Sequence, residues 1–344
     1  MRSLYFLLGI VLATAQWCVA QKSDFSHINF EKADQLALQY RDADLTNLPE
    51  LVRNLTDGLE TDVERFRAIY LWTCQNIKND YGLYAKNKRK RERFSEDTLK
   101  LEAWNEKFKK KIFKTLLKRK RTICTGYAYM VASLCQLVNI KCVIVNGFAK
   151  PSSGNSEDLK DPNHSWNAVK LNNKWYLCDP TWASGVQDVK TGRFQFNYND
   201  GLFLASPQLF AINHFPLEEQ WFLSEDKPTF EDFVLSPILY NDAYTLLEAH
   251  QNPTKLINEV TENYTANFKY ELKDKINPND ISMLIDNGFT KSTLNIDASN
   301  IEDNTLIIDY TFNKRGQYDM HLIYKDSYIA TYVFKVKRLK TSIN

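Results

Sequence analysis

The sequence predicts an α+β domain followed by a C-terminal β-sandwich. Residues 48–138 carry apolar side chains mostly at the 3.6-residue spacing of helices, whereas residues 140–182 read as short apolar strands separated by turn signals. Beyond about Pro228, several short segments alternate apolar with polar residues, which is typical of a sandwich. The 344 residues, 44% of them hydrophobic, are enough for two such domains.

The first twenty residues have the pattern of a secretory signal. Arg2 supplies a positive charge, Leu4 to Ala13 form the apolar core, and Cys18-Val19-Ala20 is a small-x-small cleavage site. A lipid-anchored Cys18 is the alternative, but the bulky Trp17 before it fits poorly. No later segment reaches about 18 apolar residues. We therefore expect a secreted or periplasmic protein, cleaved after Ala20, with no transmembrane segment.

Two helices are expected next, over Leu48 to Leu55 and over Thr61 to Lys78. The second begins with Thr61 and Glu64 at capping-box spacing. Residues 86–121 then read as a helical insertion with a basic exterior, because sixteen Lys or Arg residues stand against five Asp or Glu residues. The whole chain has a formal net charge of only +2, so the rest of it is acidic.

The basic insertion has two interpretations. The first is a solvated face whose long side chains cover apolar surface. The second is that Lys118 to Arg121, just before Cys124, favour a thiolate there and attract acidic substrates. A nucleic acid partner is not expected, because the chain is predicted to be exported and no binding motif lies beside the run.

A helix from Cys124 to Val138 and a strand from Ile140 to Val145, ending at Asn146-Gly147, are predicted before a polar loop. The face on which each side chain of the following hairpin lies can be derived, because side chains alternate between the two faces along a strand. If Asn172-Asn173 is a two-residue turn, Trp166 lies opposite Asp179, and His164 is one diagonal step away. His164 and Asp179 then share a face of the sheet. A three-residue loop would put them on opposite faces.

Five cysteines remain after the signal, and their number and spacing constrain their chemistry. The count is odd and no Cys-x-x-Cys pair occurs, so neither a disulfide framework nor a zinc site is indicated. Catalysis would explain one thiol, and the others are expected to be small buried hydrophobic residues. We expect the buried group to include Cys135, Cys142 and Cys178. No cofactor and no metal are predicted.

Cys124, His164 and Asp179 supply the parts of a nucleophilic triad. A thiol needs a base to become a thiolate at neutral pH, and the base needs a carboxylate to fix its tautomer. The predicted helix start at Cys124 and the shared strand face of His164 and Asp179 suit these roles. The sequence therefore predicts a cysteine-dependent acyl-transfer enzyme.

These residues stand in motifs that resemble the transglutaminase-like superfamily. The motifs are residues 121–128, 164–169 and 175–182, and residues 203–216 with Trp221 look like an extension found in its kyphoscoliosis-peptidase branch. The resemblance covers roughly residues 35 to 225. It implies a papain-like core, in which the helix of the nucleophile packs on an antiparallel sheet, with Cys124 as nucleophile, His164 as base and Asp179 as orienting group. The backbone amide of Cys124 would be one oxyanion donor.

The expected organisation is a signal peptide (1–20), a transglutaminase-like domain with the insertion 86–121 (21–227), and a β-sandwich (228–344). The sandwich carries no catalytic constellation, so we expect an accessory that binds a partner or substrate, or else a cover for an apolar face of the core. Three functions remain open: a peptidase or amidase, which is preferred because water is always present; a protein cross-linking transglutaminase; and a non-catalytic interaction scaffold. A protein or peptide is the expected substrate or partner.

Overall fold

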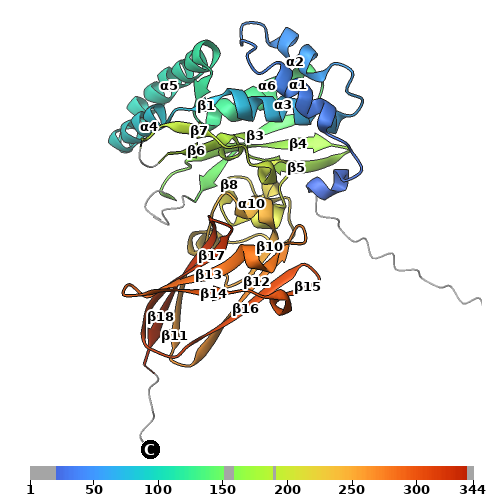
Figure 1. The fold of residues 1–344 in the computed structure, drawn as a ribbon. Coiled ribbons are helices and arrows are strands. Elements are labelled where there is room, and N and C mark those ends of the chain that lie inside the picture. Colours follow the sequence, from blue (N-terminus) through green and yellow to red (C-terminus); the bar gives the residue numbers. More distant parts are fainter. Residues whose placement is uncertain (1–20, 151–158, 189–190, 339–344) are drawn as a thin grey trace, which may run out of the picture.

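The computed structural model describes residues 21–150, 159–188 and 191–338, so the predicted signal peptide lies outside the described residues. Figure 1 shows helices packed on a small sheet in the N-terminal part and a C-terminal part made mainly of strands below it. The predicted α+β domain followed by a sandwich is therefore confirmed. Within the described residues, no helix is both long and apolar enough to cross a bilayer.

Four helices form the layer that supports the sheet. They are α1 (Glu31–Gln39), α2 (Leu48–Thr56), α3 (Asp62–Asn76) and α6 (Cys124–Leu137). The predicted capping box begins α3: the Thr61 hydroxyl accepts from the Glu64 amide, and the Glu64 carboxylate accepts from the Thr61 amide. The helices α3 and α6 bury ten and eight residues respectively, and most of these belong to the main core.

The basic insertion folds as the helical hairpin α4 (Tyr81–Arg93) and α5 (Thr98–Arg119), as predicted. It has a small apolar core of its own, in which Leu83 of α4 packs with Phe108 and Ile112 of α5. Ile123, the residue before the predicted nucleophile, completes that cluster. The hairpin is thus attached directly beside Cys124.

A four-stranded antiparallel sheet has the order β5-β4-β3-β8. Its strands are β3 (Cys142–Ala149), β4 (His164–Leu171), β5 (Lys174–Cys178) and β8 (His214–Pro216). Leu171 pairs with Lys174 across the turn, where Asn172 and Asn173 have φ of 47° and 66°. Asn tolerates this left-handed conformation, and two such residues in succession make the tight hairpin turn. The predicted two-residue turn and register are confirmed.

The predicted end of β3 at Asn146-Gly147 is wrong, because the strand continues to Ala149. Gly147 is needed for close approach rather than for a turn. A Cβ atom there would lie 2.2 Å from the Phe215 carbonyl oxygen and 2.6 Å from the Trp166 ring. The missing side chain lets β8 and β4 pack against β3 on both sides.

The C-terminal strands form two sheets. One has the order β10-β12-β16-β15, and the other β11-β18-β17-β13-β14, with β9 pairing on β18. The alternating segments expected beyond Pro228 correspond to β12, β14, β16, β17 and β18, whereas β9, β10, β11, β13 and β15 were not predicted. The bounds are β9 (Ile238–Leu239), β10 (Leu247–Asn252), β11 (Ile257–Thr261), β12 (Tyr264–Leu272), β13 (Ile281–Asp286), β14 (Lys291–Asn295), β15 (Ile301–Glu302), β16 (Thr305–Phe312), β17 (Gly316–Tyr324) and β18 (Ser327–Lys337).

The remaining elements are short. They are β1 (Lys78–Asn79), β2 (Arg121–Thr122), α7 (Pro180–Ser184), β6 (Gly185–Gln187), β7 (Phe194–Phe196), α8 (Pro207–Ala211), α9 (Phe230–Leu235) and α10 (Ala243–Leu246), with 3-10 turns at Lys22–Phe25, Asp200–Leu202, Glu219–Phe222, Pro278–Asp280 and Ala298–Asn300.

Candidate active site

Cys124, His164 and Asp179 come together from three separate elements of the core. Cys124 is the first residue of α6, His164 the first residue of β4, and Asp179 directly follows β5. The His164 Nε2 atom lies 2.7 Å from Asp179 Oδ2. The hairpin parity therefore places the two side chains on one face, as predicted. Both side chains are buried, and that of Asp179 is fully inaccessible.

The Cys124 thiol interacts with the His164 imidazole, which lowers the thiol pKa. Because Nε2 is engaged with Asp179, Nδ1 is the ring nitrogen left for the sulfur. Burial opposes ionisation of Cys124, but the bond to His164 and a bond from the Ser165 amide outweigh it and lower the thiol pKa. Burial also opposes the imidazolium, yet the nearby Asp179 carboxylate raises the His164 pKa to about 10. These shifts favour a thiolate–imidazolium pair.

The start of α6 is fixed by close packing against β2. The β2 strand pairs in parallel with β1, Thr122 opposite Asn79, just before the helix begins. A Cβ atom at Gly126 would lie 1.9 Å from the Thr122 hydroxyl, so a larger residue would push the helix away. Since Cys124 is the first helical residue, its amide has no partner inside the helix and is available to an oxyanion.

Asp179 is held rigidly by four hydrogen bonds. It is the N-cap of α7, and its Oδ1 atom accepts from the amides of Thr181 at 2.8 Å and Trp182 at 3.2 Å. Its Oδ2 atom faces two imidazoles, those of His164 and His214. Burial would raise the pKa of this carboxyl, but the two histidines hold it well below its usual range. Asp179 is therefore ionised and acts only as an acceptor.

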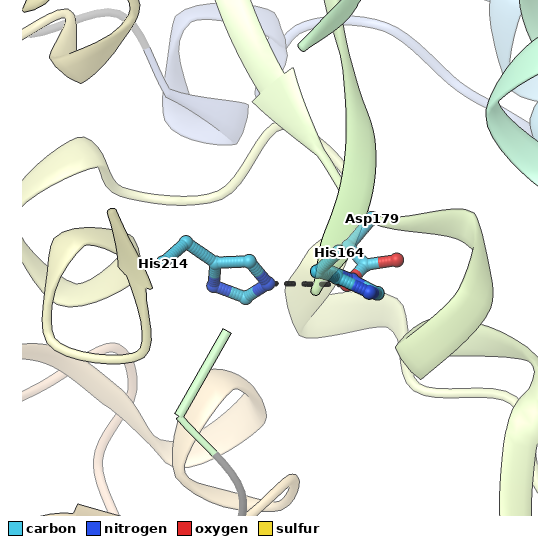
Figure 2. A group of neighbouring side chains, drawn as sticks. All are labelled: His164, Asp179 and His214. Carbon is cyan, nitrogen blue, oxygen red and sulfur yellow. Dashed lines mark hydrogen bonds and ion pairs between the residues drawn. The ribbon is translucent and has the colours of Figure 1, made fainter. Parts of the chain in front are cut away.

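His214 is a third member of this cluster and was not among the catalytic residues predicted from the sequence. Its Nε2 atom lies 3.1 Å from Asp179 Oδ2, the oxygen that His164 also faces, and Figure 2 shows the three side chains together. Its ring is fully buried and stacks on Phe210, with centroids 3.7 Å apart and an interplanar angle of 13°. Since 35 residues separate His214 from Asp179, no local spacing could have connected them.

The same three side chains offer one possible metal-ligand atom each, within 4.8 Å of one another. However, the two nitrogens are at 2.7 and 3.1 Å from one oxygen, and protons on the nitrogens account for these spacings. We predict that treatment with EDTA leaves the alkylation rate of Cys124 unchanged. Loss of reactivity on chelation, restored by added zinc, would instead establish a metal site.

Two cavities meet at Cys124 and His164 and form the arms of one cleft. The first arm, of about 520 Å³, lies between α4 and the segment before β4. The second arm, of about 540 Å³, is lined by Tyr81, Trp182 and Tyr240 among others. Cys124, His164, Tyr84, Ile123 and Asn163 line both arms.

The basic residues that line the cleft are not those expected from the sequence. Lys88 and Arg91 of α4, together with Lys160, line the first arm, alongside Glu92 and Asp161. Lys118 to Arg121 line neither arm, and within that run Arg121 pairs with Asp80 at 3.5 Å. The insertion therefore contributes its first helix to the cleft, and the charge just before Cys124 faces elsewhere.

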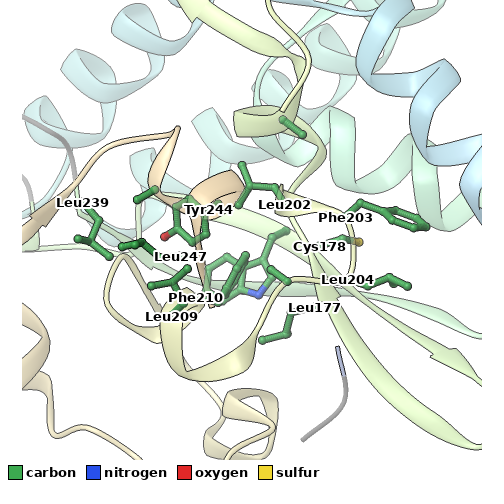
Figure 3. Close-up of a cluster of buried hydrophobic side chains, with 14 of the residues drawn as sticks. Leu177, Cys178, Leu202, Phe203, Leu204, Leu209, Phe210, Leu239, Tyr244 and Leu247 are labelled. Carbon is green, nitrogen blue, oxygen red and sulfur yellow. The ribbon is translucent and has the colours of Figure 1, made fainter. Parts of the chain in front are cut away.

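The segment leading to the sandwich closes the far side of the second arm. Leu239, Tyr240 and Asn241 line it, and Asn241 donates to the Trp182 carbonyl. Figure 3 shows Leu239, Tyr244 and Leu247 packed near Phe210 and Leu177 of the first domain. Buried apolar residues of both domains form one continuous cluster.

The remaining cysteines have the character of core residues. Cys74, Cys135 and Cys178 are free and buried, and burial raises the pKa of each thiol well above its usual value. Cys142 is free and only partly buried. Cys124 differs from these three buried thiols, because the pKa of its thiol is lowered.

Comparison with known proteins identifies the class to which this fold and site belong. Residues 49–180 match the transglutaminase-like superfamily, so the chain contains a domain of that superfamily. The resemblance drawn from the three motifs is thereby confirmed. The matched range includes Cys124, His164 and Asp179.

The chain is similar to kyphoscoliosis peptidase from Homo sapiens, with 31% identity over 245 residues, which are 70% of this chain and 34% of the relative. The Mus musculus protein of that name is 32% identical over the same shares. Hillarin from Drosophila melanogaster is 25% identical over 226 residues, 62% of this chain and 25% of that protein. The match thus spans about a third of the length of kyphoscoliosis peptidase.

Proposed function

We propose that this chain is an exported cysteine-dependent acyl-transfer enzyme that acts on peptide or protein amides, as a peptidase or amidase. Cys124 is the nucleophile, His164 the general base and acid, and Asp179 the group that orients His164. The observation that carries the proposal is that Cys124 and His164 line the cleft together where its two arms meet, with His164 hydrogen-bonded to the buried Asp179.

The proposed reaction has two halves. The Cys124 thiolate attacks the amide carbonyl carbon, and the oxyanion that forms is stabilised by the Cys124 amide and the helix N-terminus. The His164 imidazolium then protonates the departing amine as the C–N bond breaks, leaving a thioester on Cys124. Neutral His164 next removes a proton from water, hydroxide adds to the thioester, and the acid product leaves as the thiolate is regenerated.

The cleft supports an extended substrate. An amide at Cys124 has one chain direction on each side of the scissile bond, and the two arms offer a separate space of more than 500 Å³ to each. The first arm is lined by charged side chains of both signs. The second arm is lined by aromatic residues, including Tyr81, Trp182 and Tyr240.

The first test is selective acylation. The mature protein is treated with a thiol-directed acylating probe and its intact mass is measured, with Cys124→Ala and His164→Ala as matched variants. We expect one adduct on the wild-type protein and none on either variant. A wild-type protein that acquires no selective adduct would be a binding scaffold. Incubation with a protein substrate and a labelled alkylamine then separates hydrolysis from cross-linking, since only a transglutaminase incorporates the amine.

The lowered thiol pKa gives a pH-dependent prediction. Iodoacetamide should modify Cys124 at pH values below the usual thiol pKa of about 8.5. It should also modify Cys124 long before Cys135, Cys142 or Cys178. A group with a lowered pKa is ionised at pH values where an ordinary thiol is still protonated. Peptide mapping after timed alkylation at a series of pH values measures this. Equal labelling of all thiols in the folded protein would refute the assignment.

Export is proposed from residues 1–20, with cleavage after Ala20. We expect the protein recovered from the medium or periplasm of expressing cells to begin at Gln21. N-terminal sequencing decides this, and a chain retained in the cytoplasm with residues 1–20 intact would contradict it.

A further inference from the structure

His214 has two hydrogen-bond partners, and both of them can only accept a hydrogen bond. His214 Nε2 faces Asp179 Oδ2 at 3.1 Å, and His214 Nδ1 faces the Phe210 carbonyl at 3.2 Å. A neutral imidazole carries one N–H and can satisfy one of them. Burial lowers the pKa of His214, which favours the neutral form. The single proton therefore lies either on Nε2, facing Asp179, or on Nδ1, facing the Phe210 carbonyl.

The charge on Asp179 decides that choice. A hydrogen bond to an ionised carboxylate is roughly twice as strong as one to a neutral carbonyl. The proton of His214 therefore belongs on Nε2, where it points at the oxygen that also accepts from His164. The ring cannot turn away, because it is clamped between Phe210, at 3.7 Å, and Trp182, at 4.6 Å between centroids.

We propose that His214 is a positioning residue of the active site, which donates its Nε2 proton to Asp179 and so limits how strongly that carboxylate retains the proton of His164. The inference rests on the proposed function of the triad. If the buried Asp179 carboxylate accepted a hydrogen bond from His164 alone, it would hold the proton of the His164 imidazolium strongly. Acyl transfer, however, requires His164 to release that proton to the departing amine. Sharing the Asp179 oxygen between two donors weakens its hold on each.

The surroundings of His214 contain few other groups that could titrate. Asp179 and His164 face it from the end of the β4–β5 hairpin, and Tyr244 of α10 lies 6.5 Å away between ring centroids. Burial raises the pKa of Tyr244, so this phenol stays neutral. Phe210, Trp166 and Trp182 supply the remaining ring contacts. Changes at His214 should therefore be transmitted to His164 through Asp179.

The test follows the imidazole nitrogens directly by NMR. The chain has five histidines, so selective ¹⁵N-histidine labelling gives few signals, which single substitutions assign. A Cys124→Ala background removes the thiolate, so that His164 titrates against Asp179 alone. We expect His214 Nε2 to be protonated, and His214→Phe, which keeps a ring but loses the donor, to raise the His164 pKa by about one unit. His214→Gln, which restores an amide donor, should reverse most of that shift.

His250→Phe is the matched control, since His250 is a partly buried imidazole, hydrogen-bonded to the Tyr332 hydroxyl in the sandwich at 2.8 Å. It should leave the His164 titration unchanged. An unprotonated His214 Nε2 overturns the inference even if His214→Phe fails to fold, and so does an unchanged His164 pKa in a folded His214→Phe variant. Because this background lacks Cys124, failure here leaves the acylation test intact. Conversely, an unreactive Cys124 would remove the proposed function without moving the His214 proton.

Discussion

Asp179→Asn is expected to lower acyl-transfer turnover by about 10⁴-fold while the protein remains folded. The side chain keeps its shape, so Oδ1 can still accept from the amides of Thr181 and Trp182. The substitution removes the negative charge at Oδ2. An amide NH2 group in that place is a donor, and it would face the N–H donors of His164 and His214 without forming a hydrogen bond. His164 then loses the carboxylate that stabilises its imidazolium. Turnover is measured on the substrate found in the acylation experiments, with circular dichroism as the check on folding.

Asp200→Asn is a suitable control for this substitution. Asp200 is also an ionised carboxylate bound to a buried partner, Arg67, but it lies outside the cleft. We expect Asp200→Asn to reduce stability and to leave the pH dependence of Cys124 alkylation unchanged. Asp179→Asn should change the alkylation profile instead. Full turnover in a folded Asp179→Asn variant would remove Asp179 from the proposed triad.

A chain that ends at residue 227 is expected to aggregate. The segment beyond that residue contributes Phe233, Leu239, Tyr244 and Leu247 as buried side chains. Burying a large apolar side chain contributes about 1.5–3 kcal/mol, so losing four approaches the roughly 5–15 kcal/mol that stabilises an ordinary domain. The loss also leaves an exposed apolar face around Phe210. Size-exclusion chromatography of this chain, beside a control chain that ends at residue 338, measures the aggregation.

A chain that ends at residue 338 is the control, because it keeps every described element and should stay monodisperse. Between the two interpretations of the sandwich, the continuous buried cluster favours the structural one, in which this domain covers an apolar face of the core. A soluble chain ending at 227 that still acylates Cys124 would favour the accessory interpretation. In that case a loss of activity on macromolecular substrates alone would assign substrate binding to the sandwich.

The sequence by itself determined those features that depend on local geometry. The hairpin register follows from two Asn residues that accept positive φ, and strand alternation then puts His164 and Asp179 on one face. The capping box at Thr61 and the helical period after Cys124 were likewise readable, because each rule involves residues within about one turn of each other. The family motifs were readable for the same reason.

Only the tertiary structure decided what distant segments do to one another. Asn146-Gly147 has the composition of a turn, yet it lies inside a strand because two neighbouring strands need the space that Gly147 leaves empty. The charges lining the cleft come from α4 rather than from the run before Cys124, because the hairpin packs through Ile123. His214 reaches Asp179 only because β8 pairs with the far end of β3. Such contacts depend on which surfaces pack together, and no periodicity within either segment encodes them.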